Sequence, residues 1–236
     1  MSDGALTVGI VAEGPTDHVI LNQVAQVLLG DELRVLPIQP EASDAFGGFG
    51  RHGRGWTGVR RWCEDTAASS GGVLTYMSSD FGPQIEILVV HVDADIAADP
   101  QIKKERPCPP AASTVNELRK VLSRWIGLGA IPSCVVLAIP SKSTEAWIVA
   151  ALTARSGRAV VGIECRRDPA RSLTRRPHKY LDNKHGKAQK EQAVYRDLLG
   201  PVVAEHWGGV RGMCGEAERF SREFLAAVKG RPKVGD

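Results

Sequence analysis

Short apolar, β-branched runs alternate with amphipathic stretches along the first 153 residues of the chain. Such runs are typical of buried strands, whereas apolar residues spaced three and four apart are typical of helices. The predicted strands cover residues 6–12, 33–38, 85–92 and 133–139. The predicted helices between them cover residues 17–29, 56–68, 114–126 and 145–153. This alternation predicts an α/β fold with a mostly parallel sheet flanked by helices.

The rest of the chain departs from this alternation. Residues 187–199 and 216–228 are predicted helices in a basic region. We therefore expect an α/β domain over residues 1–154 and a basic helical extension over residues 155–236 that packs on it. A proline-rich segment, 97–112, is a predicted loop, and a glycine-rich segment spans residues 46–58.

Composition narrows the class of protein. The 236 residues are 43% hydrophobic and carry a net charge of +3, which excludes a wholly disordered chain. No apolar run approaches the roughly 20 residues that span a bilayer, and the N-terminus does not resemble a secretory signal. The five cysteines are scattered without a C-x-x-C pair, so we expect reduced thiols, no zinc site and a cytoplasmic protein. The sequence leaves the oligomeric state open.

Acidic residues follow three of the four predicted strands. Glu13 comes directly after the first strand, Asp93 and Asp95 follow the third, and Glu145 follows the fourth. In a parallel sheet these positions share one edge, where ligands bind. Clustered carboxylates repel one another, and a Mg²⁺ or Mn²⁺ ion with oxygen ligands relieves that repulsion. Because side chains on an extended chain repeat with period two, Asp93 and Asp95 are expected to point the same way.

Each of these motifs has an ordinary structural alternative when it stands alone. Aspartate is common in the turns that follow strands, and Gly14-Pro15 is ordinary loop chemistry. The motifs occur together, in strand order, and are followed by the S-K-S-T-E segment at residues 141–145. That combination favours a functional site over unrelated turns.

Three motifs together resemble the Toprim family, the metal-binding domain of topoisomerases, primases and OLD-type nucleases. They are V-A-E-G-P-T-D at residues 11–17, D-A-D at 93–95 and P-S-K-S-T-E-A-W at 140–147. The set is similar to the small stand-alone OLD-type Toprim-like proteins found beside ATPases in bacterial defence loci. None of the three tyrosines lies in a topoisomerase-like motif. The resemblance therefore implies a Mg²⁺- or Mn²⁺-dependent nuclease of a defence complex, with a nucleic-acid substrate and an ATPase partner.

The resemblance also implies a role for the acidic residues in phosphodiester hydrolysis. Asp93 and Asp95 would be metal ligands in a two-metal scheme. Glu13 would be either a ligand or the general base, and Glu145 would complete a second metal site.

Four neighbouring residues have competing interpretations. Asp17 is either a further metal ligand or a first-turn acid that the helix dipole favours. Lys142 either neutralises the phosphate in the transition state or is a surface lysine. His91 is expected to be a core histidine in preference to a ligand, and Trp147 is expected to pack in the core.

Positive charge is concentrated near the C-terminus. Residues 165–196 hold ten Lys or Arg and three acidic residues, a net charge of +7 that leaves −4 for the rest of the chain. Such a segment either positions a phosphate backbone or forms a solvated surface. The candidate nucleic-acid-binding residues, including two from the glycine-rich segment, are Arg51, Arg54, Arg175, Arg176, Lys179, Lys184, Lys187 and Lys190.

Two other classes of function stay open at this point. In the first, the chain is a non-catalytic Toprim-like binding subunit of an ATPase complex, and its carboxylates are structural. In the second, the D-x-D motif binds a metal–diphosphate group, as it does in nucleotide-sugar transferases. That second class does not predict the Glu13-Gly14 pair after the first strand.

Overall fold

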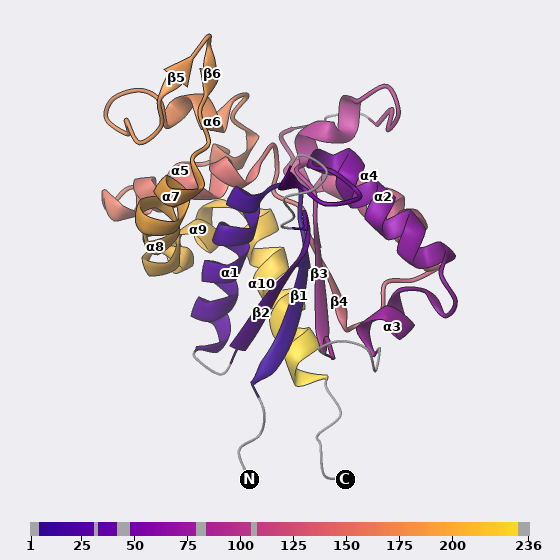
Figure 1. The fold of residues 1–236 in the computed structure, drawn as a ribbon. Coiled ribbons are helices and arrows are strands. Elements are labelled where there is room, and N and C mark those ends of the chain that lie inside the picture. Colours follow the sequence, from indigo (N-terminus) through magenta and orange to yellow (C-terminus); the bar gives the residue numbers. More distant parts are fainter. Residues whose placement is uncertain (1–4, 31–32, 42–47, 79–83, 105–107, 231–236) are drawn as a thin grey trace.

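The fold is built on a four-stranded parallel sheet. The computed structural model describes residues 5–30, 33–41, 48–78, 84–104 and 108–230. The strands are β1 (Leu6–Val11), β2 (Leu33–Gln39), β3 (Ile87–His91) and β4 (Val135–Ala138). They lie in the order β2-β1-β3-β4, and each neighbouring pair is parallel. The predicted α/β class, a parallel sheet flanked by helices, is confirmed (Figure 1).

Side chains along the buried strands alternate between two hydrophobic layers. Ile87 and Val89 of β3 belong to one core cluster, and Leu88 and Val90 belong to the other. Every residue of β3 is buried, which explains why positions 87–90 are continuously apolar instead of alternating with polar residues. His91 continues the alternation and therefore lies on the same face of the sheet as Val89.

Helices cover both faces of the sheet (Figure 1). The layer that contacts Val89 consists of α1 (Pro15–Leu29), α5 (Thr144–Arg155), α8 (Gly200–Glu205), α9 (Trp207–Met213) and α10 (Gly215–Lys229). The opposite layer consists of α2 (Gly55–Ala68), α3 (Gly72–Met77) and α4 (Ala111–Trp125). No helix in the described ranges is long and apolar enough to cross a bilayer.

Side chains from the C-terminal third pack in the same hydrophobic cluster as side chains from the sheet. Trp147 of α5 is fully buried, as predicted. Its ring centroid lies 5.3 Å from that of Trp207 in α9 and 6.0 Å from that of Phe220 in α10. One continuous cluster thus contains residues from both sides of position 154. The division into a domain and an extension stays a prediction.

Between α5 and α8 the chain forms short elements only. They are η3 (Ile163–Cys165), α6 (Pro169–Ser172), β5 (Asn183–Lys184), β6 (Lys187–Ala188), α7 (Gln192–Val194) and a π-helical turn (Tyr195–Leu199). The predicted helix over residues 187–199 is wrong in its first part. His185 and Gly186 both have positive φ, 51° and 79°, which closes an antiparallel β5–β6 hairpin before any helix begins. This hairpin projects beyond the rest of the fold in Figure 1.

The structure contains a disulfide that the sequence did not indicate. Cys108 and Cys165 are bonded, with their Cα atoms 5.5 Å apart. The prediction of reduced thiols is wrong for this pair, because 57 residues separate them and only folding brings them together. The bond joins the segment before α4 to η3. The remaining cysteines are free thiols: Cys63, Cys134 and Cys214.

Candidate functional site

The strand order changes direction at β1, which is a topological switch point of the sheet. It moves from β1 outward to β2 and then returns to β3 on the other side of β1. Such a switch leaves a crevice beyond the carboxyl ends of the two central strands, where α/β proteins bind ligands. Glu13 follows β1 and Asp93 follows β3, so both predicted site residues lie there. The backbone N–H of Asp93 donates to Glu13 Oε1 at 2.8 Å.

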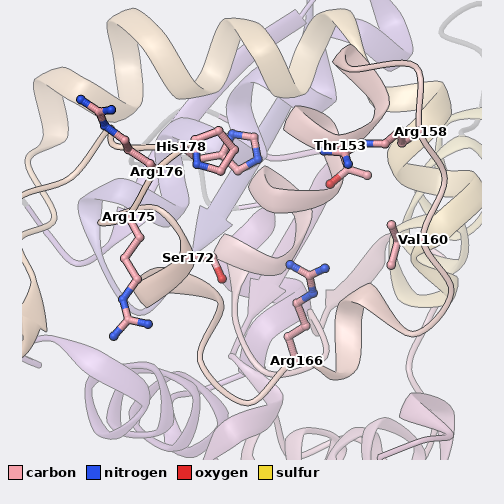
Figure 2. Close-up of a pocket in the computed structure, with 9 residues that line it drawn as sticks. Thr153, Arg158, Val160, Arg166, Ser172, Arg175, Arg176 and His178 are labelled. Carbon is pink, nitrogen blue, oxygen red and sulfur yellow. The ribbon is translucent and has the colours of Figure 1, made fainter.

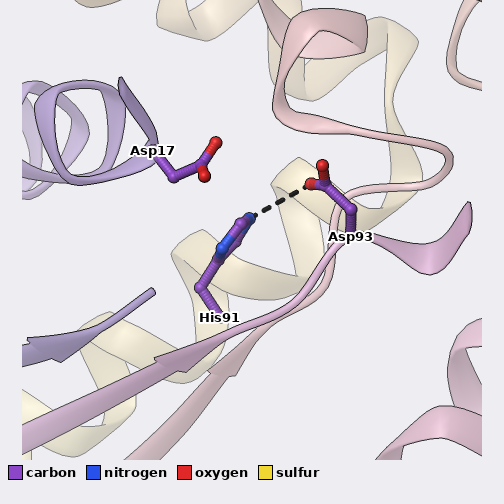
Figure 3. Close-up of side chains that lie close together, drawn as sticks. All are labelled: Asp17, His91 and Asp93. Atoms are coloured by element: carbon purple, nitrogen blue, oxygen red, sulfur yellow. Dashed lines mark ion pairs between the residues drawn. The ribbon is translucent and has the colours of Figure 1, made fainter. Parts of the chain in front are cut away.

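A buried hydrogen-bonded cluster joins Asp93 to α1 and α5. Its centre is Thr144, whose amide donates to Asp93 Oδ1 at 3.0 Å and whose hydroxyl donates to Asp17 Oδ1 at 2.9 Å. His91 Nε2 lies 3.1 Å from the Thr144 hydroxyl and 3.3 Å from Asp93 Oδ1. Figure 3 shows Asp17 reaching from α1 toward His91 and Asp93 at the end of β3.

Burial and mutual proximity set the pKa values of this cluster. Burial alone would lower the pKa of His91, but the hydrogen bond with Asp93 and the charge of Asp17 raise it to about 9. Burial raises the pKa of Asp93 to about 6. Burial, together with the nearby charge of Asp93, raises the pKa of Glu13 to about 8. Near neutral pH, His91 and Glu13 therefore both carry a proton while Asp93 is mostly ionised.

Asp17, His91 and Asp93 form a group that is able to hold a metal ion. Each offers one ligand atom, these atoms lie within 4.8 Å of one another, and all three residues are buried. Two carboxylates and an imidazole are a donor set that first-row divalent metals accept. A metal ion here would take over the charge-balancing role of the protonated imidazole. The sequence placed His91 in the core, which is correct, but gave it no part in metal binding.

Glu145 lies in the first turn of α5, with a side chain that is 1% exposed. Its Oε1 accepts hydrogen bonds from the Tyr195 hydroxyl at 2.7 Å and from Lys190 Nζ at 2.7 Å. Burial opposes its ionisation, but the charge of Lys190 and the hydrogen bonds from Lys190, Tyr195 and Ser143 outweigh burial and hold the pKa of Glu145 below its ordinary value. Its Oε2 is buried without a hydrogen-bond partner among the described residues.

A pocket of about 320 Å³, the carboxylate pocket, opens between these groups and the segment that follows η3. Acidic and basic side chains both face it. Its lining residues are Asp93, Asp95, Lys142, Ser143, Glu145, Arg167, Asp168, Pro169, Ala170 and Lys190. The pocket therefore combines predicted metal ligands with cations that suit a phosphate. Glu13 and Asp17 are not among these lining residues; Asp17 is buried and Glu13 is half-buried.

Asp95 occupies a different position from the one that its spacing predicts. The chain leaves the extended conformation after Asp93 and forms a 3₁₀ turn, η2 (Ala94–Ala98). Asp93 is buried and Asp95 is exposed, and the extended chain on which the period-two expectation was based ends at Asp93. Both still line the carboxylate pocket. Lys142, at a positive φ of 67°, lines it too, and its carbonyl accepts the Asp95 amide at 3.1 Å.

The arginines of the glycine-rich segment have local partners. Arg51 pairs with Asp65 of α2 at 2.7 Å. The Arg54 guanidinium lies 5.0 Å from the centroid of the Phe49 ring. Positions 46 and 47 of the segment lie outside the described residues. The Arg51–Asp65 pair connects the segment to α2. Nucleic-acid binding by Arg51 and Arg54 stays a prediction.

The candidate basic residues of the C-terminal third do not all share one site. Lys190 belongs to the carboxylate pocket through its ion pair with Glu145, so its first role is to neutralise that carboxylate. The other candidates in this third are exposed: Arg175, Arg176, Lys179, Lys184 and Lys187.

Sequence reasoning missed the groups that hold the carboxylates in place. Thr144 was visible only as one letter of S-K-S-T-E, and its three partners come from distant parts of the chain. Tyr195 is 50 residues from Glu145 and lies in no recognisable motif. No match was found for this chain among protein-family models, curated proteins or solved structures, so the Toprim resemblance rests on the three motifs alone.

Proposed function

We propose that this protein is a metal-dependent nuclease that hydrolyses phosphodiester bonds of DNA or RNA. One observation carries the proposal: carboxylates that follow three different strands, Glu13, Asp93 and Glu145, gather at one crevice. Lys190 balances Glu145, but burial raises the pKa of both Glu13 and Asp93, and a bound cation would favour their ionised forms. The crevice lies at the switch point of the sheet, where a substrate can reach it.

The residues that would hold a metal ion are Asp17, His91 and Asp93. Their imidazole nitrogen favours Mn²⁺ over Mg²⁺, because Mg²⁺ prefers an all-oxygen shell. A bound divalent ion supplies Lewis-acid activation of the phosphate and of a water molecule. Glu13, whose pKa is raised to about 8 by burial and by Asp93, would be ionised and able to act as a general base only with a bound cation beside it, because a nearby positive charge lowers the pKa of a carboxyl.

Basic groups in the same pocket would position the substrate. Lys142 and Arg167 share the carboxylate pocket with Asp93 and Glu145. Cations placed there counter the negative charge that builds up on a phosphate during its hydrolysis. The excess of lysine and arginine over residues 165–196 would hold the rest of the nucleic-acid backbone.

The direct test is cleavage of plasmid DNA, single-stranded DNA and RNA with Mg²⁺ or Mn²⁺. We expect Asp93→Asn to reduce cleavage by at least about a hundredfold, because it removes a charge-bearing ligand from the cluster. Asp182→Asn is the matched control, since Asp182 is exposed beside the hairpin and outside the carboxylate pocket. Cleavage by Asp93→Asn at the wild-type rate would contradict the proposal.

The Toprim resemblance extends the proposal to a defence complex that includes an ATPase. The same cleavage assay is therefore run with and without a purified candidate ATPase partner. Stimulation that requires Asp93 would support a shared complex. Cleavage that is unaffected by such an ATPase would restrict the proposal to the isolated nuclease.

A second candidate is a non-catalytic binding subunit. It is favoured by the fact that Asp17, Asp93 and Glu145 already have internal partners in Thr144 and Lys190. Titration calorimetry with Mn²⁺ separates the two candidates. A nuclease site should bind the metal, and Asp17→Asn should weaken binding. Absence of any Mn²⁺ binding would favour the binding subunit.

A further inference from the structure

A second pocket, the arginine pocket, lies outside the carboxylate pocket and has a volume of about 340 Å³. It is formed by the C-terminal end of α5 and the segment that follows it. Its lining residues are Thr153, Arg158, Val160, Arg166, Ser172, Arg175, Arg176, Pro177 and His178. Figure 2 shows this pocket and the side chains that surround it.

The lining of the arginine pocket is strongly cationic. It contains four arginines and a histidine and no acidic side chain among the residues that the structure describes. None of the four arginines forms an ion pair with an aspartate or glutamate in the described ranges. All four are exposed, so their charges are available to a ligand. Four uncompensated guanidinium groups around one cavity repel one another unless an anion balances them.

The groups at the centre of the pocket differ from those at its rim. In Figure 2 the Arg166 guanidinium reaches into the space between Ser172, Thr153 and the His178 ring, whereas Arg176 extends outward. The pKa of His178 is lowered, first by burial and then by the positive charges of nearby arginines. These arginines include Arg158 and Arg166, which line the same pocket. A neutral His178 still has one ring N–H to donate.

The arginine pocket and the carboxylate pocket are neighbours on the same segment. Arg166 lines the first and Arg167, the next residue, lines the second. Cys165, directly before them, is fixed by its disulfide to Cys108. The two pockets are therefore adjacent along the chain, but they share no lining residue.

We propose that the arginine pocket binds a phosphate group of a nucleic acid, as a metal-independent subsite beside the carboxylate pocket. Guanidinium forks match phosphate oxygens with paired hydrogen bonds, and the Ser172 hydroxyl adds a donor of the kind that phosphate accepts, whereas the Thr153 hydroxyl already donates to the Val149 carbonyl. A single carboxylate would leave most of the positive charge unbalanced. The nucleic-acid source of the phosphate rests on the proposed function, whereas the phosphate chemistry does not.

The test measures binding by the full-length protein without any divalent metal. The probes are inorganic phosphate, a nucleoside monophosphate, and one fluorescent oligonucleotide prepared with a 5′-phosphate, a 3′-phosphate or no terminal phosphate. We expect phosphate and the oligonucleotides to bind, with Arg166→Ala weakening each by about tenfold or more, as loss of a charge-assisted hydrogen bond requires. Arg166→Lys should recover only part of the loss, because an ammonium cannot form a paired contact.

The matched control is Arg222→Ala, an exposed arginine on α10 outside both pockets. Its affinity should stay within about twofold of wild type, and its salt dependence should be unchanged. In contrast, Arg166→Ala should reduce the slope of log affinity against log salt by roughly one. Equal weakening by both substitutions would overturn the proposal, because the binding would then be general electrostatic attraction.

The oligonucleotide series identifies the source of the phosphate. Tighter binding of one terminally phosphorylated form shows that the pocket takes a chain end, and equal binding of all three forms shows that it takes an internal phosphodiester. Binding of the monophosphate without any oligonucleotide binding would refute the nucleic-acid assignment. Absence of metal-dependent cleavage would refute the proposed nuclease and leave phosphate binding standing, so the two failures are distinguishable.

Discussion

The two pockets of this molecule are built in opposite ways. At the carboxylate pocket, Asp93, Glu145 and the adjoining Asp17 are buried and hydrogen-bonded: Asp93 and Asp17 to Thr144, and Glu145 to Lys190. In the arginine pocket the guanidinium groups are exposed, and none forms an ion pair with a described acid. Removing a partner from a buried group leaves an unsatisfied charge, whereas removing an exposed group costs the fold little. We therefore expect stability and function to be coupled in the first pocket and separable in the second.

Helix α5 contributes residues to both pockets, so a substitution that disturbs the packing of α5 should affect both pockets. Thr144 and Glu145 lie at its start, and Thr153 near its end lines the arginine pocket. Trp147 holds it by packing against Trp207 and Phe220. We expect Trp147→Ala to lower the free energy of unfolding by about 3–5 kcal/mol and to weaken both metal and phosphate binding.

Urea unfolding followed by circular dichroism measures this effect. Trp56→Ala is the control, because Trp56 is half-buried in α2 and stacks on Trp125 in the other layer of the sheet. Its loss should cost less and leave both pockets intact. If Trp147→Ala and Trp56→Ala had the same effect on ligand binding, α5 would not be the shared support.

Thr144→Val tests the buried cluster alone. Valine keeps the shape of threonine but removes the hydroxyl that donates to Asp17 and contacts His91. We expect a loss of about 1–3 kcal/mol in the free energy of unfolding, the cost of leaving buried polar groups without a partner. The arginine pocket should keep its phosphate affinity.

The same unfolding experiment on Thr66→Val supplies the comparison, because Thr66 is only half-buried in α2. Its hydroxyl has no hydrogen bond recorded in the described structure, so its loss should be within about 0.5 kcal/mol. An equally small effect of Thr144→Val would show that the hydroxyl does not hold the cluster together.

The contrast between the pockets also explains what the sequence predicts well. Glu13 and Asp93 were found because strand ends are local signals and parallel strands bring their ends to one edge. Thr144 and Tyr195 were missed because their importance arises from contacts across 51 and 50 residues. Asp95 was misplaced because period two applies only while the chain stays extended, and η2 ends that extension.

A different limit applies to the basic segment. Its net charge was correctly read from the sequence, but charge does not reveal that Lys190 turns inward to Glu145. Nor does it reveal that Arg166 and Arg167 line different pockets. Composition gives the total charge, while the path of an irregular segment between short elements decides where each charge lies. The Cys108–Cys165 bond belongs to the same class of long-range information.

Glu216, at the start of α10, is a buried acid that lines neither pocket, so it shows the effect of burial without that of the site. Burial raises its pKa to about 7 from an ordinary 4.5, against the opposing charge of Arg219. As pH rises, the Glu216 carboxyl therefore loses its proton at a lower pH in the unfolded chain than in the folded chain. Its contribution to the free energy of unfolding is fully present below pH 4.5 and is lost as pH rises through about 7. Above that pH we expect Glu216→Gln to be more stable than wild type by about 1–2 kcal/mol.

The measurement is the difference in unfolding free energy between Glu216→Gln and wild type from pH 4.5 to 8. It should be near zero at the acid end and grow toward neutral pH. Glu205→Gln, at a side chain that is 72% exposed, should show no such trend. A difference that is flat across the range would mean that Glu216 gains enough from Arg219, 3.4 Å away, to offset its burial.

The smallest expected effect is on the stability of the ligand-free arginine pocket. Arg166→Ala should change the free energy of unfolding by no more than about 0.5 kcal/mol, since Arg166 is exposed and forms no ion pair with a described acid. It should even be slightly stabilising if the four arginines repel one another. Arg119→Ala is the contrast, because Arg119 pairs with Glu223 at 3.0 Å in a partly buried contact between α4 and α10.

Thermal unfolding with added phosphate then completes the comparison: phosphate should stabilise wild type and Arg119→Ala alike, and leave Arg166→Ala nearly unchanged. A large loss of stability in ligand-free Arg166→Ala would show that this arginine supports the fold, and the separation between the two pockets would fail.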